Sequence, residues 1–270
     1  MDKLTKTNHL RLSQFIESQL RRGAITFTKE SALKALGCSE IAFMRASQRL
    51  QKKGLLLRPV TGFYVIIEVE YRDAGGPPPS HYLQKLMSHL RLPYYIGLLS
   101  AASFHGATHQ SVMETQVVTT RSLPIIEYGR SRIRFIKNKF AEKIPKQPLK
   151  TPHGDVMLSS PEATLFDLLR YNQKAAGLSH IATVILEMAN TISANKLPAI
   201  AEIYNDVPLA QRVGYMLDRF GDRKTSINLY KWLKGRDVGF VKLRPSMKEK
   251  RETNTKWSLN INTSIEPDEV

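Results

Sequence analysis

The sequence predicts an α+β protein with two domains, a small N-terminal module and a larger mixed domain. Residues 11–66 have the pattern of three helices followed by a short hairpin. The run "YRDAGGPPPS" at 71–80 combines paired glycines with three prolines, which interrupts every regular pattern. A chain of 270 residues is also long enough for two hydrophobic cores. We therefore expect a first domain at 1–72, a linker at 73–80 and a second domain at 81–270.

Two helices open the N-terminal module. The first is predicted over 11–22, where apolar residues recur at helical spacing and Gly23 ends the pattern. The second is predicted over 29–36, with the hydroxyl of Thr28 as its N-cap and Gly37 in the turn that follows. The tight turn predicts that the next helix starts immediately.

The third helix is the most cationic element of the module. Its predicted N-cap is Ser39, and Gly54 is expected to take the left-handed conformation that ends the helix after Lys53. On a period of 3.6 residues the helix has an apolar side and a polar side. The apolar side holds Phe43, Ala46, Ser47 and Leu50, and the polar side holds Ile41, Arg45, Gln48, Arg49 and Lys52.

A hairpin follows, because the β-prone runs 55–57 and 63–66 are joined by a Pro/Gly turn at 58–62. Three helices and a hairpin are the order of a winged helix-turn-helix, whose third helix enters a major groove of DNA. Arg can bridge guanine, Gln can bridge adenine, and Lys pairs with phosphate. The predicted contacts with double-stranded DNA are Thr28, Ser39, Ile41, Arg45, Gln48, Arg49, Lys52, Arg58 and Thr61. The alternative is a solvated helix face without a partner.

The charge of the chain favours a polyanionic partner. Lys and Arg number 40 against 24 Asp and Glu, which gives a net charge of +16, and the excess is concentrated in 1–72, 121–150 and 219–256. The second and third blocks have three interpretations: contacts with DNA phosphates, contacts with an acidic partner, or charge that only aids solubility. Their candidate residues are Arg121, Arg130, Arg132, Arg134, Lys137, Arg223, Lys224 and Lys231.

Cysteine content and hydropathy predict a cytoplasmic protein. The single cysteine, Cys38, excludes an intramolecular disulfide and suits a reducing compartment. The N-terminus is polar and lacks the apolar core of a secretory signal. The apolar run 94–104 is too short to span a bilayer, so no membrane contact is expected.

The second domain is predicted to mix helices and strands. A helix is expected at 81–90, a nearly all-apolar helix at 93–106, and strands at 115–120 and 132–136. A further strand precedes a helix that has Ser160 as N-cap and proline at its first position. Helical periodicity returns at 180–190, 197–204, 209–220 and 226–234, and two final strands are expected at 241–244 and 257–261.

Motifs for catalysis are absent from the sequence. It has no phosphate-binding glycine loop, no metalloprotease histidine motif, no paired cysteines and no nucleophile elbow. His105 and His109 have the spacing of two metal ligands, but a glycine intervenes and no third ligand is marked. Asp155, Glu162 and Asp167 could serve a metal-dependent nuclease, although Glu162 also suits a helix N-terminus. We predict no catalytic residue, metal or cofactor, and retain the nuclease as an alternative hypothesis.

Several stretches together resemble the AbiEi family of antitoxins, the partners of nucleotidyltransferase-like toxins in bacterial type IV toxin-antitoxin systems. The resemblance spans roughly 14–262. It rests on the N-terminal winged helix followed, in this order, by "YYIGLLSAASFHGATHQ", "SSPEATLFDLL", "LAQRVGYMLDRFG" and "VKLRP".

The resemblance implies a protein with two functions. Members of the family repress their own operon by binding inverted repeats in the promoter, and their C-terminal domain is associated with antitoxicity. In this sequence the DNA-reading helix would be 39–53 and the wing 58–64. A homodimer on DNA and a cognate nucleotidyltransferase-like toxin are the implied partners. The alternative is an orphan winged-helix regulator whose second domain senses a ligand or dimerises.

Overall fold

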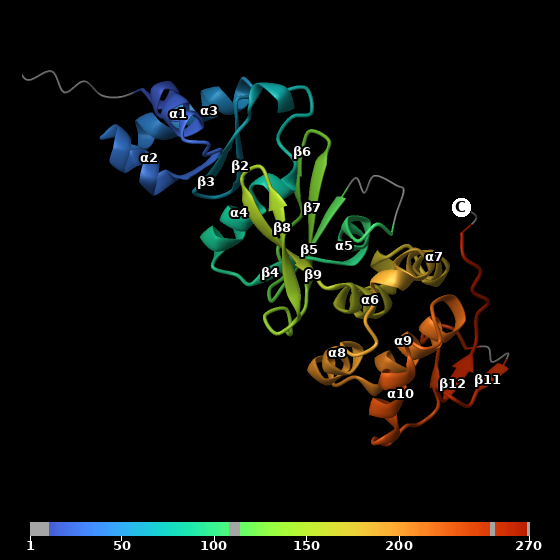
Figure 1. Ribbon diagram of the computed structural model, residues 1–270. Helices are drawn as coiled ribbons and strands as arrows, with labels where there is room; N and C mark the ends of the chain where they lie inside the picture. Colours follow the sequence, from blue (N-terminus) through green and yellow to red (C-terminus); the bar gives the residue numbers. More distant parts are fainter. Residues whose placement is uncertain (1–10, 108–113, 249–251, 269–270) are drawn as a thin grey trace, which may run out of the picture. The chain divides into compact units, whose positions relative to one another are not determined.

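The computed structural model describes residues 11–107, 114–248 and 252–268, and it has the predicted α+β fold (Figure 1). Contacts divide the chain into two compact units. The first contains Met1–Pro93 with Pro124–Arg134 and Leu149–Val156, and the second contains Tyr94–Leu123, Phe135–Pro148 and Met157–Val270. This division falls after the expected linker at 73–80, and independent folding of domains on either side of that linker stays a prediction.

The first unit starts with the element order that was predicted for the N-terminal module. Its small antiparallel sheet has the order β1-β3-β2, and the three helices pack beside it (Figure 1). The order is that of winged helix-turn-helix domains. The elements are α1 (Leu12–Arg21), β1 (Thr26–Thr28), α2 (Lys29–Leu36), α3 (Glu40–Lys52), β2 (Leu56–Val60) and β3 (Phe63–Ile66).

Local capping explains where these helices begin. The hydroxyl of Thr28 accepts a hydrogen bond from the Ser31 amide at the start of α2, and the hydroxyl of Ser39 accepts one from the Ala42 amide at the start of α3. Gly37 ends α2 in the left-handed conformation. The predicted caps are therefore confirmed.

Aromatic packing holds α3 on the sheet. Phe27 and Tyr64 stack with ring centroids 5.2 Å apart, and Phe43 of α3 meets Tyr64 edge-on at 5.4 Å. Phe15 of α1 meets Phe27 edge-on at 5.3 Å. One side of α3 is thus fixed in the core, and this fixes which side faces solvent.

Beyond the N-terminal module, the first unit contains further helices and strand segments. It contains η1 (Val69–Tyr71), η2 (Pro79–His81), α4 (Leu83–Leu90) and β6 (Ile126–Tyr128). The Arg130 amide donates to the Ala74 carbonyl oxygen at 3.2 Å. A Cβ on Gly129 would lie 2.1 Å from that oxygen, so only glycine permits this approach.

A six-stranded sheet has the order β6-β7-β5-β4-β9-β8. Its central strand β4 runs antiparallel to β5 and parallel to β9. The predicted strands at 115–120 and 132–136 are confirmed, whereas the strands at β6 and β8 were not predicted. Besides β6, the strands are β4 (Tyr94–Ile96), β5 (Glu114–Thr119), β7 (Ser131–Lys137), β8 (Lys146–Thr151) and β9 (Gly154–Ser159).

The predicted apolar helix at 93–106 is wrong, because that stretch forms β4 followed by α5 (Leu98–Phe104). An apolar run buried on both faces has the same composition whether it is a strand or a helix. Leu98 takes a φ of +51°, which breaks any continuous helix across the junction. The small residues Ser100, Ala101 and Ala102 of this run lie in α5, which packs on α6 (Pro161–Arg170).

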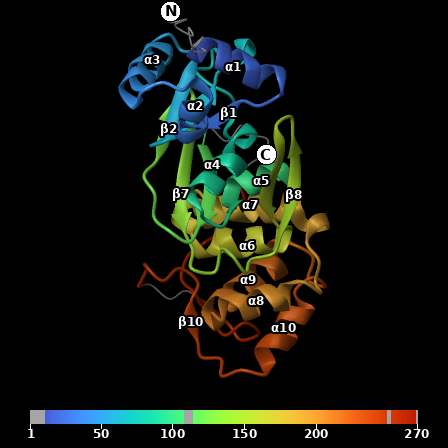
Figure 2. The same cartoon turned by 90° about the vertical axis from the view of Figure 1, so that its left-hand side faces the viewer.

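Helices dominate the remainder of the second unit. Ser160 caps α6 as predicted, and α8, α9 and α10 pack against one another (Figure 2). The final strands pair as expected, β10 parallel to β12, with β11 added on the other side. The elements are η3 (Asn172–Lys174), α7 (Leu178–Met188), η4 (Ala189–Thr191), α8 (Leu197–Tyr204), α9 (Val207–Phe220), α10 (Ile227–Lys234), β10 (Val241–Lys242), β11 (Glu252–Asn254) and β12 (Leu259–Ile261).

Across the described ranges, no helix combines the length and apolar character that a bilayer crossing requires.

Candidate nucleic-acid interface

Helix α3 presents a regular row of side chains to solvent. Ile41, Arg45, Gln48 and Lys52, spaced i, i+4, i+7 and i+11, are all exposed, and we call them the outer stripe. The opposite side is held in the core by Phe43 and Ser47, which are buried. The predicted separation of a core side and a solvent side is thus observed. The outer stripe combines a guanidinium, an amide, an ammonium and one branched apolar side chain.

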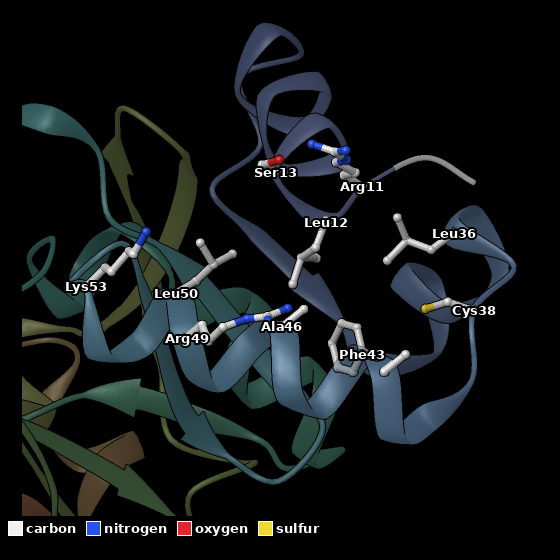
Figure 3. A pocket seen from close by; sticks show the side chains of 11 residues that line it. Arg11, Leu12, Ser13, Leu36, Cys38, Phe43, Ala46, Arg49, Leu50 and Lys53 are labelled. Atoms are coloured by element: carbon white, nitrogen blue, oxygen red, sulfur yellow. The ribbon is translucent and has the colours of Figure 1, made fainter. Parts of the chain in front are cut away.

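Arg49 lies at the edge of this arrangement. It is exposed, as expected for the polar side, but it also lines a groove of about 450 Å³ between α1 and α3 (Figure 3). Arg11 and Lys53 line the same groove, and its apolar surface includes Leu12 and Leu50. At about 100° per residue, Arg49 lies about 70° around the helix from the centre of the outer stripe, on the side of the groove.

The start of α3 is fixed from two sides. Glu40, its first residue, forms an ion pair with Lys29 of α2, with Oε2 and Nζ 2.7 Å apart. Ser39 supplies the cap described above, so its hydroxyl already accepts a hydrogen bond within the protein. The same holds for Thr28 at α2, which is half-buried. These two residues position the helices, and any contact they make with DNA adds to that structural role.

Strands β2 and β3 form the predicted hairpin, which is the candidate wing. Arg58 and Thr61 are both exposed, and the register shifts between Leu57 and Val60, so β2 carries a bulge before the turn. The turn is anchored at its base, since the Lys29 amide donates to the Gly62 carbonyl oxygen at 2.8 Å. Thr61 therefore lies in an anchored turn, and Arg58 lies in the irregular part of β2 that leads to it.

The second basic block is divided between the two units. In the first unit Arg130 is exposed, and Arg132 pairs with Glu127, with Nε and Oε1 3.0 Å apart. Arg134 is half-buried on β7. In the second unit Arg121 and Lys137 are exposed. Part of this block is thus already engaged within the protein.

The third basic block surrounds α10. Arg223, Lys224 and Lys231 are exposed, as a contact with a polyanion or an acidic partner requires. A feature that the sequence did not indicate lies nearby. The Arg236 guanidinium lies 3.6 Å from the centre of the Trp232 ring and also pairs with Glu202, so this cation is held within the protein.

The residues considered for metal binding or catalysis have other roles or lie elsewhere. His105 Nε2 lies 2.8 Å from the Ser159 carbonyl oxygen, and burial lowers the pKa of His105. His109 falls outside the described residues. Glu162 Oε1 accepts a hydrogen bond from the Ser193 amide at 2.9 Å. Among residues that the structure describes, no three acidic, histidine or cysteine side chains gather in a way that could hold a metal ion.

Asp167 instead anchors a buried polar network that the sequence did not indicate. It is fully buried on α6 and accepts hydrogen bonds from Tyr95 at 2.8 Å and from Tyr204. Asn138 donates to Tyr204 at 3.1 Å. Burial raises the pKa of Asp167 to about 6, and the tyrosine hydrogen bonds and the charge of Arg170 oppose this rise. These residues link β4, α6 and α8 within the second unit.

Comparison with known proteins finds a family match in the central part of the chain. Residues 95–219 match the family model of the AbiEi antitoxin C-terminal domain. No curated protein matches the chain. The crystal structure of the RV2827C protein from Mycobacterium tuberculosis is similar in fold, with a TM-score of 0.66 over 92% of this chain and 89% of that chain at 16% identity.

A second solved structure is too distant to be informative. The antibiotic-resistance factor ANT(2'')-Ia matches over 46% of this chain and 88% of its own at 15% identity, with a TM-score of 0.31. The likeness to RV2827C, at its low identity, shows the fold alone. Function is therefore informed by the match of residues 95–219 to the AbiEi antitoxin C-terminal domain family.

Proposed function

We propose that this protein is a transcriptional repressor that binds inverted repeats in its own promoter and acts as antitoxin to a nucleotidyltransferase-like toxin. The DNA-binding part of this proposal is supported by the outer stripe of α3, whose side chains are exposed and belong to the same module as the hairpin of β2 and β3. The family match over residues 95–219 supports the antitoxin half. Repression follows from occupancy of the promoter.

Each side chain of the interface has a distinct role in this proposal. Arg45 offers two donors that fit the acceptors of guanine, and Gln48 offers the donor and acceptor that fit adenine. Lys52 at the end of the stripe and Arg58 on the wing pair with phosphates, which fix the position of the protein without reading sequence. Thr61 adds a hydroxyl for a phosphate oxygen next to the wing. We propose that Arg49, at the edge of the groove between α1 and α3, also pairs with a phosphate of the DNA backbone.

Binding to inverted repeats requires two copies of the chain. A symmetric site carries the same half-site twice, so a homodimer on DNA places one α3 in each. The exposed cations of the second and third basic blocks are proposed to contact phosphates or an acidic partner: Arg121, Arg130, Lys137, Arg223, Lys224 and Lys231. Arg132 and Arg134 contribute to the same field, although Arg132 is already paired with Glu127. Added phosphate contacts would steepen the salt dependence of binding.

Arg45→Ala and Gln48→Ala are each expected to reduce the preference for the promoter over random DNA. The loss should be roughly 1 to 3 kcal/mol for a contact made through two hydrogen bonds. Lys52→Ala should weaken binding to both DNAs by a similar factor, because phosphate contacts are independent of sequence. Gel-shift titrations of the purified variants at several salt concentrations would measure both effects.

The three residues form a matched set, since they share one stripe and all are exposed, so their truncation leaves the fold intact. Unchanged thermal unfolding of each variant is the control. Equal losses on promoter and random DNA for Arg45→Ala and Gln48→Ala would mean that α3 does not read bases.

The antitoxin half predicts protection of cells against a toxin encoded beside the gene. The full chain should protect, and so should the double variant Arg45→Ala/Gln48→Ala expressed from an unrelated promoter, since antitoxicity is assigned to the predicted second domain, 81–270. Survival after toxin induction is the measurement. Death with the wild-type chain, or no adjacent nucleotidyltransferase reading frame, would favour the orphan regulator instead.

A further inference from the structure

One residue of the outer stripe, Ile41, has a side chain that can neither form a hydrogen bond with DNA nor carry a charge. Ile41 is the second residue of α3, and 67% of its surface is exposed. An exposed isoleucine has lower helix propensity than alanine and leaves apolar surface in water. Isolated exposed apolar side chains are common on protein surfaces, so exposure by itself indicates nothing. Ile41 stands out because it lies in the row of side chains that we propose to face DNA.

We infer that Ile41 reads the 5-methyl group of a thymine in the major groove. This inference rests on the proposed DNA binding and specifies what part of the site recognises. The thymine methyl is the apolar feature of the major groove, and apolar side chains recognise it by contact. In helix-turn-helix proteins the N-terminal residues of the third helix approach base edges most closely, which is where Ile41 lies.

The first turn of α3 is rigid enough for such a contact. The ion pair of Glu40 with Lys29 and the cap from Ser39 hold the residues on either side of the Ile41 backbone. A β-branched side chain on a helix has one strongly preferred χ1 rotamer, so Ile41 loses little freedom when it meets a base. A fixed, branched apolar group suits a methyl that lies at one defined position.

The geometry also predicts where the thymine lies. Ile41 and Arg45 are four residues apart on one stripe, which is about 6 Å along the helix at about 1.5 Å per residue. With α3 lying along the major groove, as the proposal requires, and base pairs spaced by about 3.4 Å, the thymine is expected within roughly two base-pair steps of the guanine read by Arg45. An operator half-site with an A·T pair at this spacing follows from the inference.

Replacing thymine with uracil removes the methyl group and leaves base pairing unchanged, which makes a direct test. The probes are duplexes that tile the promoter of the gene, with each thymine of the bound half-sites replaced in turn, titrated with the full chain at one salt concentration. One position per half-site should lose about fourfold in affinity, the value expected for one buried methyl at about 0.8 kcal/mol. With Ile41→Ala the same replacement should have no effect.

Val69→Ala is the matched control, because Val69 is 74% exposed in the same unit but lies outside α3. It should retain the full uracil effect. If the protein binds the promoter specifically but no uracil replacement matters, or the loss persists in Ile41→Ala, the inference is overturned and the proposed function stands. If no promoter duplex is preferred over random DNA, both fail.

Discussion

Replacing Gly214 with alanine should lower the free energy of unfolding by about 3 kcal/mol, the upper end of the range for overpacking. A Cβ at Gly214 would lie 2.1 Å from Cζ3 and 2.2 Å from Cη2 of Trp257. Gly214 is inside α9, where alanine would otherwise stabilise the helix by about 1 kcal/mol. The sign of the effect therefore distinguishes packing from helix propensity.

Trp257 cannot move aside cheaply, because its ring and backbone are both held. The side chain is fully buried, and Nε1 donates to Asp218 Oδ2 at 2.7 Å. The Gln211 amide group donates to the Trp257 carbonyl oxygen at 2.9 Å. These contacts join α9 to the chain just before β12, so relief of the clash would separate elements of the second unit.

Urea or thermal unfolding of the purified variant would measure the effect. Gly235→Ala is the control, since a Cβ there meets only the Trp232 carbonyl oxygen at 4.0 Å and the backbone φ is −83°. It should be neutral or slightly stabilising. In a Trp257→Phe background the additional cost of Gly214→Ala should be smaller, because the benzo ring atoms that clash with the new Cβ are gone. A Gly214→Ala variant as stable as the wild-type chain would contradict the packing argument.

The N-terminal module was predictable because its signals are local. The caps at Thr28 and Ser39, the left-handed Gly37 and the alternation of sides on α3 all depend on neighbours within a few residues. The placement of Arg49 beside a groove was not predictable, because it depends on where α1 packs. Helical periodicity is enough to predict the residues of the outer stripe, whereas the position of Arg49 at the groove becomes visible only in the folded chain.

The second unit was predicted less well because its determinants are distant in sequence. Whether 93–106 forms a helix or a strand is decided by pairing of β4 with β5 and β9. Tyr95 and Asp167 are joined across 72 positions, so no local pattern marks them as partners. Similarly, the charge of Arg236 is paired with Glu202, which lies 34 positions away in the sequence.

The stability of the second unit should fall as pH rises through about 6, because of Asp167. Burial raises its folded-state pKa to about 6 from an ordinary value of 3.8, so the folded chain holds the proton more tightly than the unfolded chain. The stabilising contribution of protonated Asp167 to the free energy of unfolding is thus fully present below about pH 4 and is lost as pH rises through about 6. At about 1.36 kcal/mol per pH unit, the change is about 3 kcal/mol.

Asp167→Asn isolates this contribution, because the amide keeps the size of the side chain and cannot titrate. The difference in free energy of unfolding between wild type and variant should decline by about 3 kcal/mol from pH 4 to pH 7. Asp218→Asn gives a control of opposite sign: burial opposes ionisation of Asp218, but hydrogen bonds from Lys256, Ser226 and Trp257 outweigh it and lower its pKa. Its contribution is lost as pH falls. A difference curve for Asp167→Asn that is flat across this range would mean that the tyrosine hydrogen bonds of Tyr95 and Tyr204 fully compensate burial of the carboxylate.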